Sequence, residues 1–170
     1  MSDDSRASPA KVLRRRLLFA TAALLGGCGF ELRHPPTVQF STIALAGFAP
    51  RSPMADELRR ELQSVTRVVE VPKDAQVVLQ ALIDRRERVV VATTTAGQVR
   101  QLQLRVRFRF RLESPGGREL LAPDELMLWR EISYNETNAL AKEEEEGQVY
   151  RALQSDIVAQ VMRRLGALKT

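Results

Sequence analysis

The sequence predicts an α+β fold in which two helices pack on one face of a four-stranded, mainly antiparallel sheet, in the order β-α-β-β-β-α. Three observations predict it. Residues 102–112 alternate between apolar and polar side chains without interruption, which is typical of a strand with one buried face. Two other segments carry apolar residues at helical spacing. Short, turn-rich connections join three long strand-like segments, which indicates an antiparallel meander.

A strand and a helix are expected first. Residues 38–45 are rich in Val, Phe, Thr and Ile, so we expect a strand that ends before Gly47. The helix is predicted over about residues 53–64, because Ser52 is a favourable N-cap and Pro53 is favourable at the first helical position. Its apolar stripe consists of Met54, Leu58, Leu62 and Val65.

The three strands of the meander are predicted over about residues 75–91, 98–113 and 120–135. Residues 93–97 and 114–117 supply the connecting turns. The apolar alternation falters at residues 84–88, where we expect a β-bulge. Pro123 cannot donate a ladder hydrogen bond, so it predicts an irregular start or an edge position for the last strand.

A long helix is expected to close the fold. It is predicted to begin near Asn138, which is a favourable cap, and to end at about Leu165. Gly147 interrupts the pattern and predicts a kink, since glycine costs about 1 kcal/mol relative to alanine inside a helix. The stripe expected to be buried consists of Leu140, Tyr150, Leu153, Ile157, Val161 and Leu165.

Cys28, the only cysteine among the 170 residues, indicates how the chain is attached to a membrane. It follows a basic stretch ending at Arg16, a short apolar run over residues 17–25, and the small residues Gly26 and Gly27. This order is the layout of a secretory signal. Leu-Gly-Gly-Cys also has the form of a bacterial lipobox, in which the thiol is acylated and the chain is cut before the cysteine. The alternative is an ordinary cleaved signal followed by an incidental cysteine.

The lipobox interpretation divides the chain into three parts. Residues 1–27 are expected to be a lipoprotein signal peptide, residues 28–37 a lipidated tether, and residues 38–170 a single domain. The apolar run is well short of the ~20 residues that a transmembrane helix needs, so we expect an acyl anchor instead of a span. Gly29 follows the cysteine. By analogy with bacterial lipoprotein sorting, the absence of Asp there favours the outer membrane.

The charge of the chain argues against one class of partner. The formal net charge is +5, but the predicted signal peptide holds five basic and two acidic residues, which leaves 21 basic and 19 acidic residues. A net charge of +2 gives little general attraction to nucleic acid, so we expect no nucleic-acid partner.

The residues do not support an enzyme. His34 is the only histidine and lies in the predicted tether, while Cys28 is expected to be acylated, which argues against a Ser-His-Asp or Cys-His arrangement. A paired-carboxylate mechanism stays open, but nothing in the spacing singles out a pair. The sequence has no His/Cys cluster for zinc and no Gly-rich phosphate loop. We expect no catalytic residues, no metal and no cofactor.

The strongest candidate site is a row of arginines on one face of the predicted strand 98–113. Period-two geometry places its apolar residues toward the helices and its arginines on the opposite face, about 6.6–7 Å apart. The row consists of Arg105, Arg107, Arg109 and Arg111. Two interpretations stay open. One is a solvated face paired with neighbouring carboxylates, the other is a ladder that binds phosphates or a partner's carboxylates, and the two can coexist. The expected carboxylates are Asp84, Glu87, Asp124, Glu125 and Glu131.

Three short motifs together resemble one protein family. They are Cys-Gly-Phe-Glu-Leu-Arg at 28–33, Ala-Gly-Gln at 96–98, and Asn-Ala-Leu-Ala-Lys-Glu-Glu-Glu-Glu at 138–146. In this order, behind a lipobox and with the predicted element order, they resemble the LptE family of lipopolysaccharide-assembly lipoproteins. That family comprises the outer-membrane partners of the barrel LptD.

The resemblance implies a non-enzymatic accessory protein. It implies an outer-membrane lipoprotein that plugs and helps to assemble an LptD-like barrel and binds lipopolysaccharide (LPS). The family's LPS-contacting lysine carries over to Lys142. Its basic residue near the hairpin tip does not carry over, because Thr95 precedes Ala96, and Arg100 is the nearest basic residue. The alternative is another outer-membrane lipoprotein adaptor, namely a secretin pilot, a cell-wall synthase activator or an auxiliary subunit of phospholipid transport.

Overall fold

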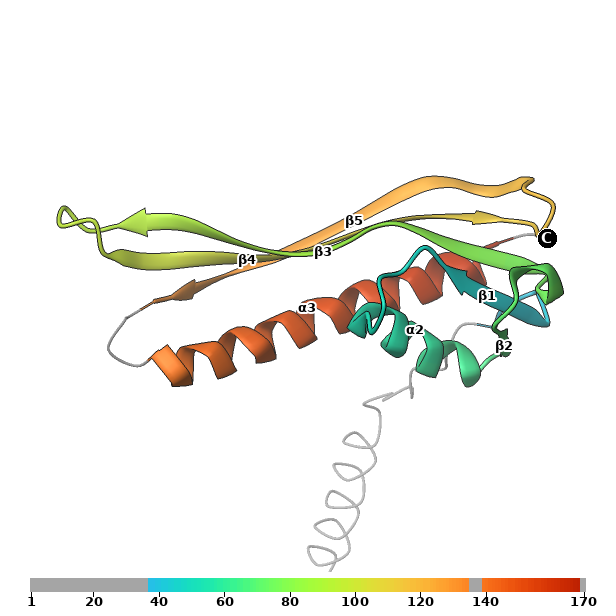
Figure 1. Cartoon of the computed structure of the whole chain (residues 1–170), viewed down its shortest axis with the longest axis horizontal. Helices are drawn as coiled ribbons and strands as arrows, with labels where there is room; N and C mark the ends of the chain where they lie inside the picture. Colours follow the sequence, from blue (N-terminus) through green and yellow to red (C-terminus); the bar gives the residue numbers. More distant parts are fainter. Residues whose placement is uncertain (1–36, 135–138, 169–170) are drawn as a thin grey trace, which may run out of the picture. The chain divides into compact units, whose positions relative to one another are not determined.

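The strands form one five-stranded mixed sheet, in the order β2-β1-β3-β4-β5 (Figure 1). The computed structural model describes residues 37–134 and 139–168. The strands are β1 (Thr42–Ala46), β2 (Arg67–Val69), β3 (Val77–Thr93), β4 (Val99–Glu113) and β5 (Glu119–Ser133). The helices are α2 (Pro53–Gln63), α3 (Ala139–Gly166) and a short 3-10 turn, η1 (Pro72–Asp74). The predicted signal peptide, 1–27, and all of the predicted tether, 28–37, except Thr37 lie outside the described residues.

The α+β class and the two helices are confirmed, but the predicted number of strands is wrong. The prediction missed β2, whose three residues are too few to show a period of two. Strand β1 runs parallel to both β2 and β3, so the sheet is mixed. Helix α2 returns the chain to the same end of the sheet between β1 and β2, and the connection that contains η1 returns it again between β2 and β3. Both helices lie on the same face of the sheet (Figure 1).

The meander β3-β4-β5 is antiparallel, as predicted. The bulge expected at residues 84–88 is absent, because that stretch pairs with β4 in regular register. The register shifts instead between Ala81 and Ile83. The alternation falters at 84–88 for another reason: polar residues of β3 face the helices there. Pro123 behaves as expected, since β5 is an edge strand and its register with β4 shifts between Asp124 and Leu121.

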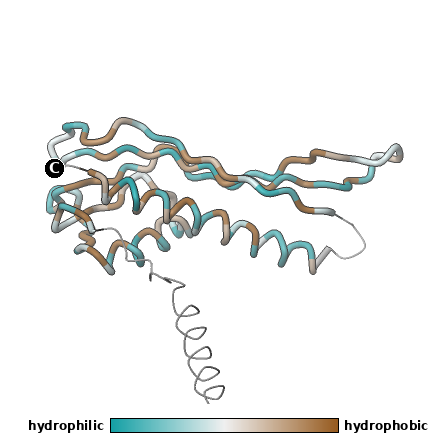
Figure 2. The backbone as a smooth tube through the Cα atoms, turned by 180° about the vertical axis from the view of Figure 1, so that it is seen from behind, coloured by the Kyte–Doolittle hydropathy of each residue, from teal (hydrophilic) through white to brown (hydrophobic). Residues whose placement is uncertain are grey.

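The apolar face of β4 forms the centre of the core. Its six alternating apolar residues are at most 1 % exposed, and they are Leu102, Leu104, Val106, Phe108, Phe110 and Leu112. The ring of Phe108 lies 5.9 Å from that of Phe48 and 5.4 Å from that of Phe110, centroid to centroid. Figure 2 shows the same alternation of hydrophobic and hydrophilic residues along the long strands. Helix α3 packs against this face of β4, and α2 lies on the same side of the sheet (Figure 1).

Helix α2 begins as the sequence predicts. The Ala55 N–H donates to Oγ of Ser52 at 3.1 Å, and Pro53 follows the cap. The Ser52 hydroxyl also donates to Oδ2 of Asp84 at 2.6 Å, which ties the start of the helix to β3. Met54, Leu58 and Leu62 are buried as predicted, and Val65 is half-buried. Gly47 precedes the helix at φ +78°, and a Cβ there would lie 2.3 Å from the Ala81 carbonyl oxygen. Glycine is therefore required at this turn.

Helix α3 runs from Ala139 to Gly166 as one continuous helix, so Gly147 does not end it. The predicted stripe members Leu153, Ile157, Val161 and Leu165 are buried, and Tyr150 is half-buried. The expected cap Asn138 lies outside the described residues, and so does the side chain of Leu140.

Gln154 joins three elements in the interior and is only 4 % exposed. Its amide nitrogen donates to the Pro53 carbonyl oxygen at 3.0 Å and to the Glu57 carboxylate, both on α2. Its amide oxygen accepts from Nη2 of Arg86 on β3 at 2.7 Å. Both the nitrogen and the oxygen of this buried amide have hydrogen-bond partners, so it fixes the position of α3 against α2 and the sheet.

Replacement of Phe108 by Ala tests the central role of the β4 core face. Phe108 is fully buried, so we expect Phe108→Ala to lower the free energy of unfolding by about 3–5 kcal/mol. Urea denaturation followed by circular dichroism measures this change. Arg118→Ala, at an exposed turn, is the matched control, and its expected effect is within about 0.5 kcal/mol. Equal stability of the two variants would contradict the assigned core.

Candidate functional site

The arginines of β4 lie on the face of the sheet that points away from the helices, as predicted. Arg105, Arg107 and Arg111 are half-buried, and Arg109 is exposed. The burial of every alternate residue on the other side of β4 leaves these side chains no other orientation. We call this helix-free side of β3, β4 and β5 the outer face.

The outer face is organised in rows that cross the sheet. The strand register places a β3 residue and a β5 residue directly beside three of the arginines. The rows are Ile83–Arg109–Glu125, Arg85–Arg107–Met127 and Glu87–Arg105–Trp129. Side chains that are directly opposite in neighbouring strands are about 4.5–5.5 Å apart at Cβ, so the members of each row are close neighbours.

Glu125 is the one expected carboxylate that pairs with the arginine row within the described residues. Its two oxygens accept from Nε and Nη2 of Arg107 at 2.7 Å and 3.1 Å. This hydrogen bond raises the pKa of the Arg107 guanidinium and lowers the pKa of the Glu125 carboxyl. The solvated interpretation of the row is thus correct for Arg107.

The other expected carboxylates have different partners. Asp84 accepts from Ser52, Asp124 pairs with Arg164 of α3, and Glu131 accepts from Gln101 and Gln103. Glu87 makes no ion pair within 4 Å with any other described residue, although its charge contributes to the raised pKa of Arg107. These acidic groups therefore do not neutralise the row.

Several cations on the outer face consequently have no carboxylate partner. Arg85 and Arg109 make no ion pair within the part of the chain that the structure describes, and Nε of Arg105 donates to the side chain of Gln103. Arg111 pairs with Glu113 at 3.0 Å, while its own Nε is buried without a hydrogen bond. Guanidinium groups in this state can accept bidentate anions such as phosphate or carboxylate.

The other two predicted site residues lie elsewhere. Lys142 is in the first turns of α3, in the layer opposite the outer face, and its Nζ pairs with Glu145 at 2.6 Å. Arg100 is exposed at a register shift near the start of β4, and its carbonyl accepts from the Tyr134 N–H at 2.8 Å. The first turns of α3 and the start of β4, to which these residues belong, lie toward the end of the domain that carries the β3-β4 hairpin (Figure 1). The structure thus divides the predicted site into an outer-face row and a hairpin-end pair.

Sequence analysis missed the arginines on the helix side of β3. Nε of Arg88 lies 3.2 Å from the Glu146 carboxylate, and its guanidinium stacks 5.1 Å from the Tyr134 ring. Arg86 bonds Gln154 and lies 5.4 Å from the Tyr150 ring. Pairing of these positions with Leu104 and Val106 gives their orientation, but that register could not be read from one sequence.

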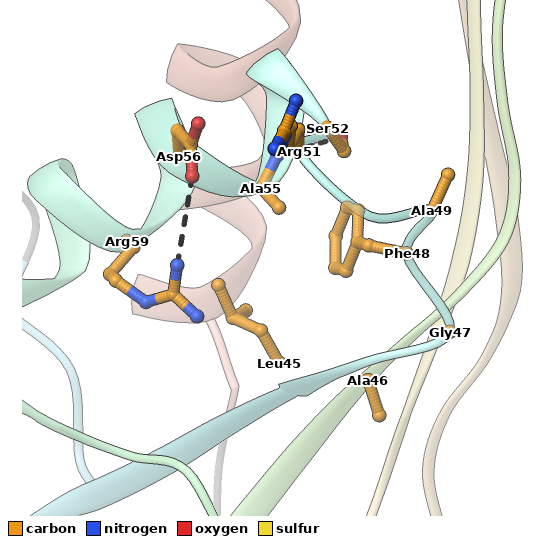
Figure 3. A pocket seen from close by; sticks show the side chains of 10 residues that line it. All are labelled: Leu45, Ala46, Gly47, Phe48, Ala49, Arg51, Ser52, Ala55, Asp56 and Arg59. Atoms are coloured by element: carbon orange, nitrogen blue, oxygen red, sulfur yellow. Dashed lines mark hydrogen bonds and ion pairs between the residues drawn. The ribbon is translucent and has the colours of Figure 1, made fainter.

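A small pocket lies between the β1-α2 loop and α2 (Figure 3). Arg59 crosses it to reach Asp56 at 3.7 Å, and it also lies 3.8 Å from Glu70. The remaining lining is mostly small or apolar, from Leu45 to Ala55. Within the described residues no group of three or more His, Cys, Asp or Glu side chains is placed to hold a metal ion. The pocket offers no catalytic arrangement.

Comparison with known families shows the family to which this chain belongs. The model of the family described as "LptE: Lipopolysaccharide-assembly" matches residues 40–165, which include every described strand and nearly all of α3. The chain belongs to the LptE family. No curated protein matches it by sequence. Within the described residues, no helix is both long enough and apolar enough to cross a membrane.

Solved structures of lipoproteins share the LptE-family fold. The solution structure of lipoprotein B from Nitrosomonas europaea is 26 % identical, with a TM-score of 0.69 over 82 % of this chain and 91 % of that one. The minor lipoprotein of Acinetobacter baumannii is 18 % identical, with a TM-score of 0.64 over 76 % and 93 %. The rare lipoprotein B of Shewanella oneidensis is 19 % identical, with a TM-score of 0.63 over 75 % and 95 %.

The ion pair on the outer face can be tested by titration. Arg107→Ala removes the hydrogen bond and the charge that hold the pKa of Glu125 down, so we expect that pKa to rise toward its ordinary value. Carbon-detected NMR of the side-chain carboxyl measures the change. Arg118→Ala is the control, because its side chain lies at the β4-β5 turn and should leave Glu125 unchanged. An identical titration of Glu125 in both variants would rule out the pair in solution.

Proposed function

We propose that this LptE-family protein is an outer-membrane lipoprotein that plugs and helps to assemble an LptD-like barrel and binds LPS during its insertion into the outer leaflet. The family match over residues 40–165 is the observation that carries the proposal. We further propose that the protein acts by binding and not by catalysis.

Attachment to the membrane would come through Cys28. Val38, near the start of the described domain, lies ten positions after Cys28, and a fully extended chain of this length reaches about 33–36 Å. Two or more acyl chains give stable attachment. The domain could therefore enter the lumen of a neighbouring barrel while its anchor stays in the bilayer.

The geometry of the domain supports a binding role. The β3-β4 hairpin extends past the first turn of α3 (Figure 1), and Arg100 and Lys142 are near this end. Arginine and lysine are the residues that most often bind phosphate groups. We propose that Arg100 replaces the basic residue missing at position 95 and acts with Lys142 in LPS contact.

Purification of the lipidated full-length protein through a C-terminal tag tests the partner. We expect a large barrel in stoichiometric amount, together with LPS, when outer membranes are solubilised in mild detergent. Mass spectrometry identifies the bands, and Cys28→Ser, which should leave the outer-membrane fraction, is the control for anchoring. Recovery of a secretin, a cell-wall synthase or a phospholipid-transport subunit in place of the barrel would contradict the proposal.

LPS binding by the hairpin-end pair is tested with a double variant. Arg100→Ala with Lys142→Ala should weaken binding of labelled LPS by about tenfold, because exposed charge pairs contribute up to roughly 1 kcal/mol each. The remaining binding should fall further in high salt. The matched control is Lys73→Ala with Arg118→Ala, which removes two exposed cations far from this end of the domain. Equal binding by both double variants would remove the pair from the site.

A further inference from the structure

The middle of the outer face carries more positive charge than its own carboxylates neutralise. Arg85 lies directly opposite Arg107, and like charges in this position destabilise a sheet. Arg105 and Arg109 flank Arg107 on the same strand, about 6.6–7 Å away. Glu125 is the one carboxylate that hydrogen-bonds to these four arginines within the described residues. The cluster therefore has unfilled capacity for an anion.

Two exposed apolar side chains border this cluster. Met127 is opposite Arg107 and is 49 % exposed, and Trp129 is opposite Arg105 and is 53 % exposed. Both belong to β5, the edge strand, so no further strand lies beyond them. A large exposed aromatic residue is informative because such surface is normally buried. Trp in particular suits boundaries where one side is apolar and the other is wet.

We propose that this outer-face patch, formed by Arg85, Arg105, Arg107, Arg109, Met127 and Trp129, binds the phosphorylated saccharide headgroup of LPS. The guanidinium groups would donate hydrogen bonds to the phosphate oxygens. Trp129 and Met127 would contact the sugar ring and the first part of the acyl chains. This inference rests on the proposed function and adds a second contact region to it, on the face opposite Lys142.

Phosphate fits the patch better than a protein carboxylate does. A phosphate group concentrates up to two negative charges on three acceptor oxygens, so several guanidinium groups can converge on it. Glu125 already occupies the bidentate position on Arg107. The open side of the patch toward the sheet edge then leaves room for the apolar part of an amphiphile. An acidic protein surface would match the charge but would not use this juxtaposition of cations and apolar edge.

The single tryptophan of the chain makes the patch directly observable. In the free full-length protein, held in mild detergent, Trp129 should emit at long wavelength and be quenched readily by acrylamide. Addition of LPS should shift the emission to shorter wavelength and protect Trp129 from the quencher. Monophosphoryl lipid A should act more weakly than the bisphosphorylated form, and phosphatidylglycerol vesicles and inorganic phosphate should leave the emission almost unchanged.

Charge removal tests the same patch without disturbing the core. The triple variant Arg85→Gln, Arg105→Gln, Arg109→Gln should need at least about tenfold more LPS for the same shift of the Trp129 emission, because charge-assisted hydrogen bonds are lost. The control, Arg51→Gln, Arg60→Gln, Arg118→Gln, removes the same number of arginines from exposed positions elsewhere and should titrate like the parent. Equal titration of both triple variants would overturn the proposal.

Direct measurement of bound LPS separates the two proposals. Binding of labelled LPS with no change at Trp129 would overturn the outer-face patch and leave the proposed function intact. A shift caused by the purified barrel, and not by LPS, would also overturn the patch and assign this face to a protein partner. Absence of LPS binding by any measure would contradict the proposed LPS-binding function as well.

Discussion

Burial of the apolar face of β4 is the constraint on which the rest of the structure depends. Six alternate side chains of this strand are at most 1 % exposed, which requires helices on that side of the sheet. Because strand side chains alternate, the same burial holds the four arginines of β4 on the outer face. One strand thus determines both where the core lies and where the unneutralised charge is displayed.

Polar contacts then select one arrangement of α3 on the apolar layer. Gln154 bonds α2 and β3 together, and Arg88 reaches Glu146 near the beginning of the helix. The Tyr150 hydroxyl donates to the Glu87 carbonyl oxygen at 2.8 Å, and burial raises the pKa of this phenol, so it stays a neutral donor. Hydrophobic burial alone would permit α3 to slide along the sheet, whereas these directional bonds require a single register.

Much of the fold could be predicted because its signals are local. The alternation of β4, the Ser52 cap and the apolar stripe of α3 each lie within one segment. What could not be predicted depends on pairing between distant segments. Strand β2 is recognisable only from its pairing with β1. Polar residues of β3 that face the helices interrupt the apolar alternation, which led to the wrong prediction of a bulge. For the same reason, exposed Trp129 and its position beside Arg105 required the register of β4 with β5.

The two faces of the sheet have different roles: the inner face carries the core, and the outer face is proposed to bind LPS as a second contact region besides Arg100 and Lys142. Site-specific photo-crosslinking in growing cells tests this most directly. A photoreactive residue at Val89, which lies opposite Gln103 on the outer face, should crosslink to LPS, and one at Arg60 on α2 should not. Crosslinking of LPS from Arg60 alone, with none from Val89, would contradict the assignment of the outer face as the binding surface.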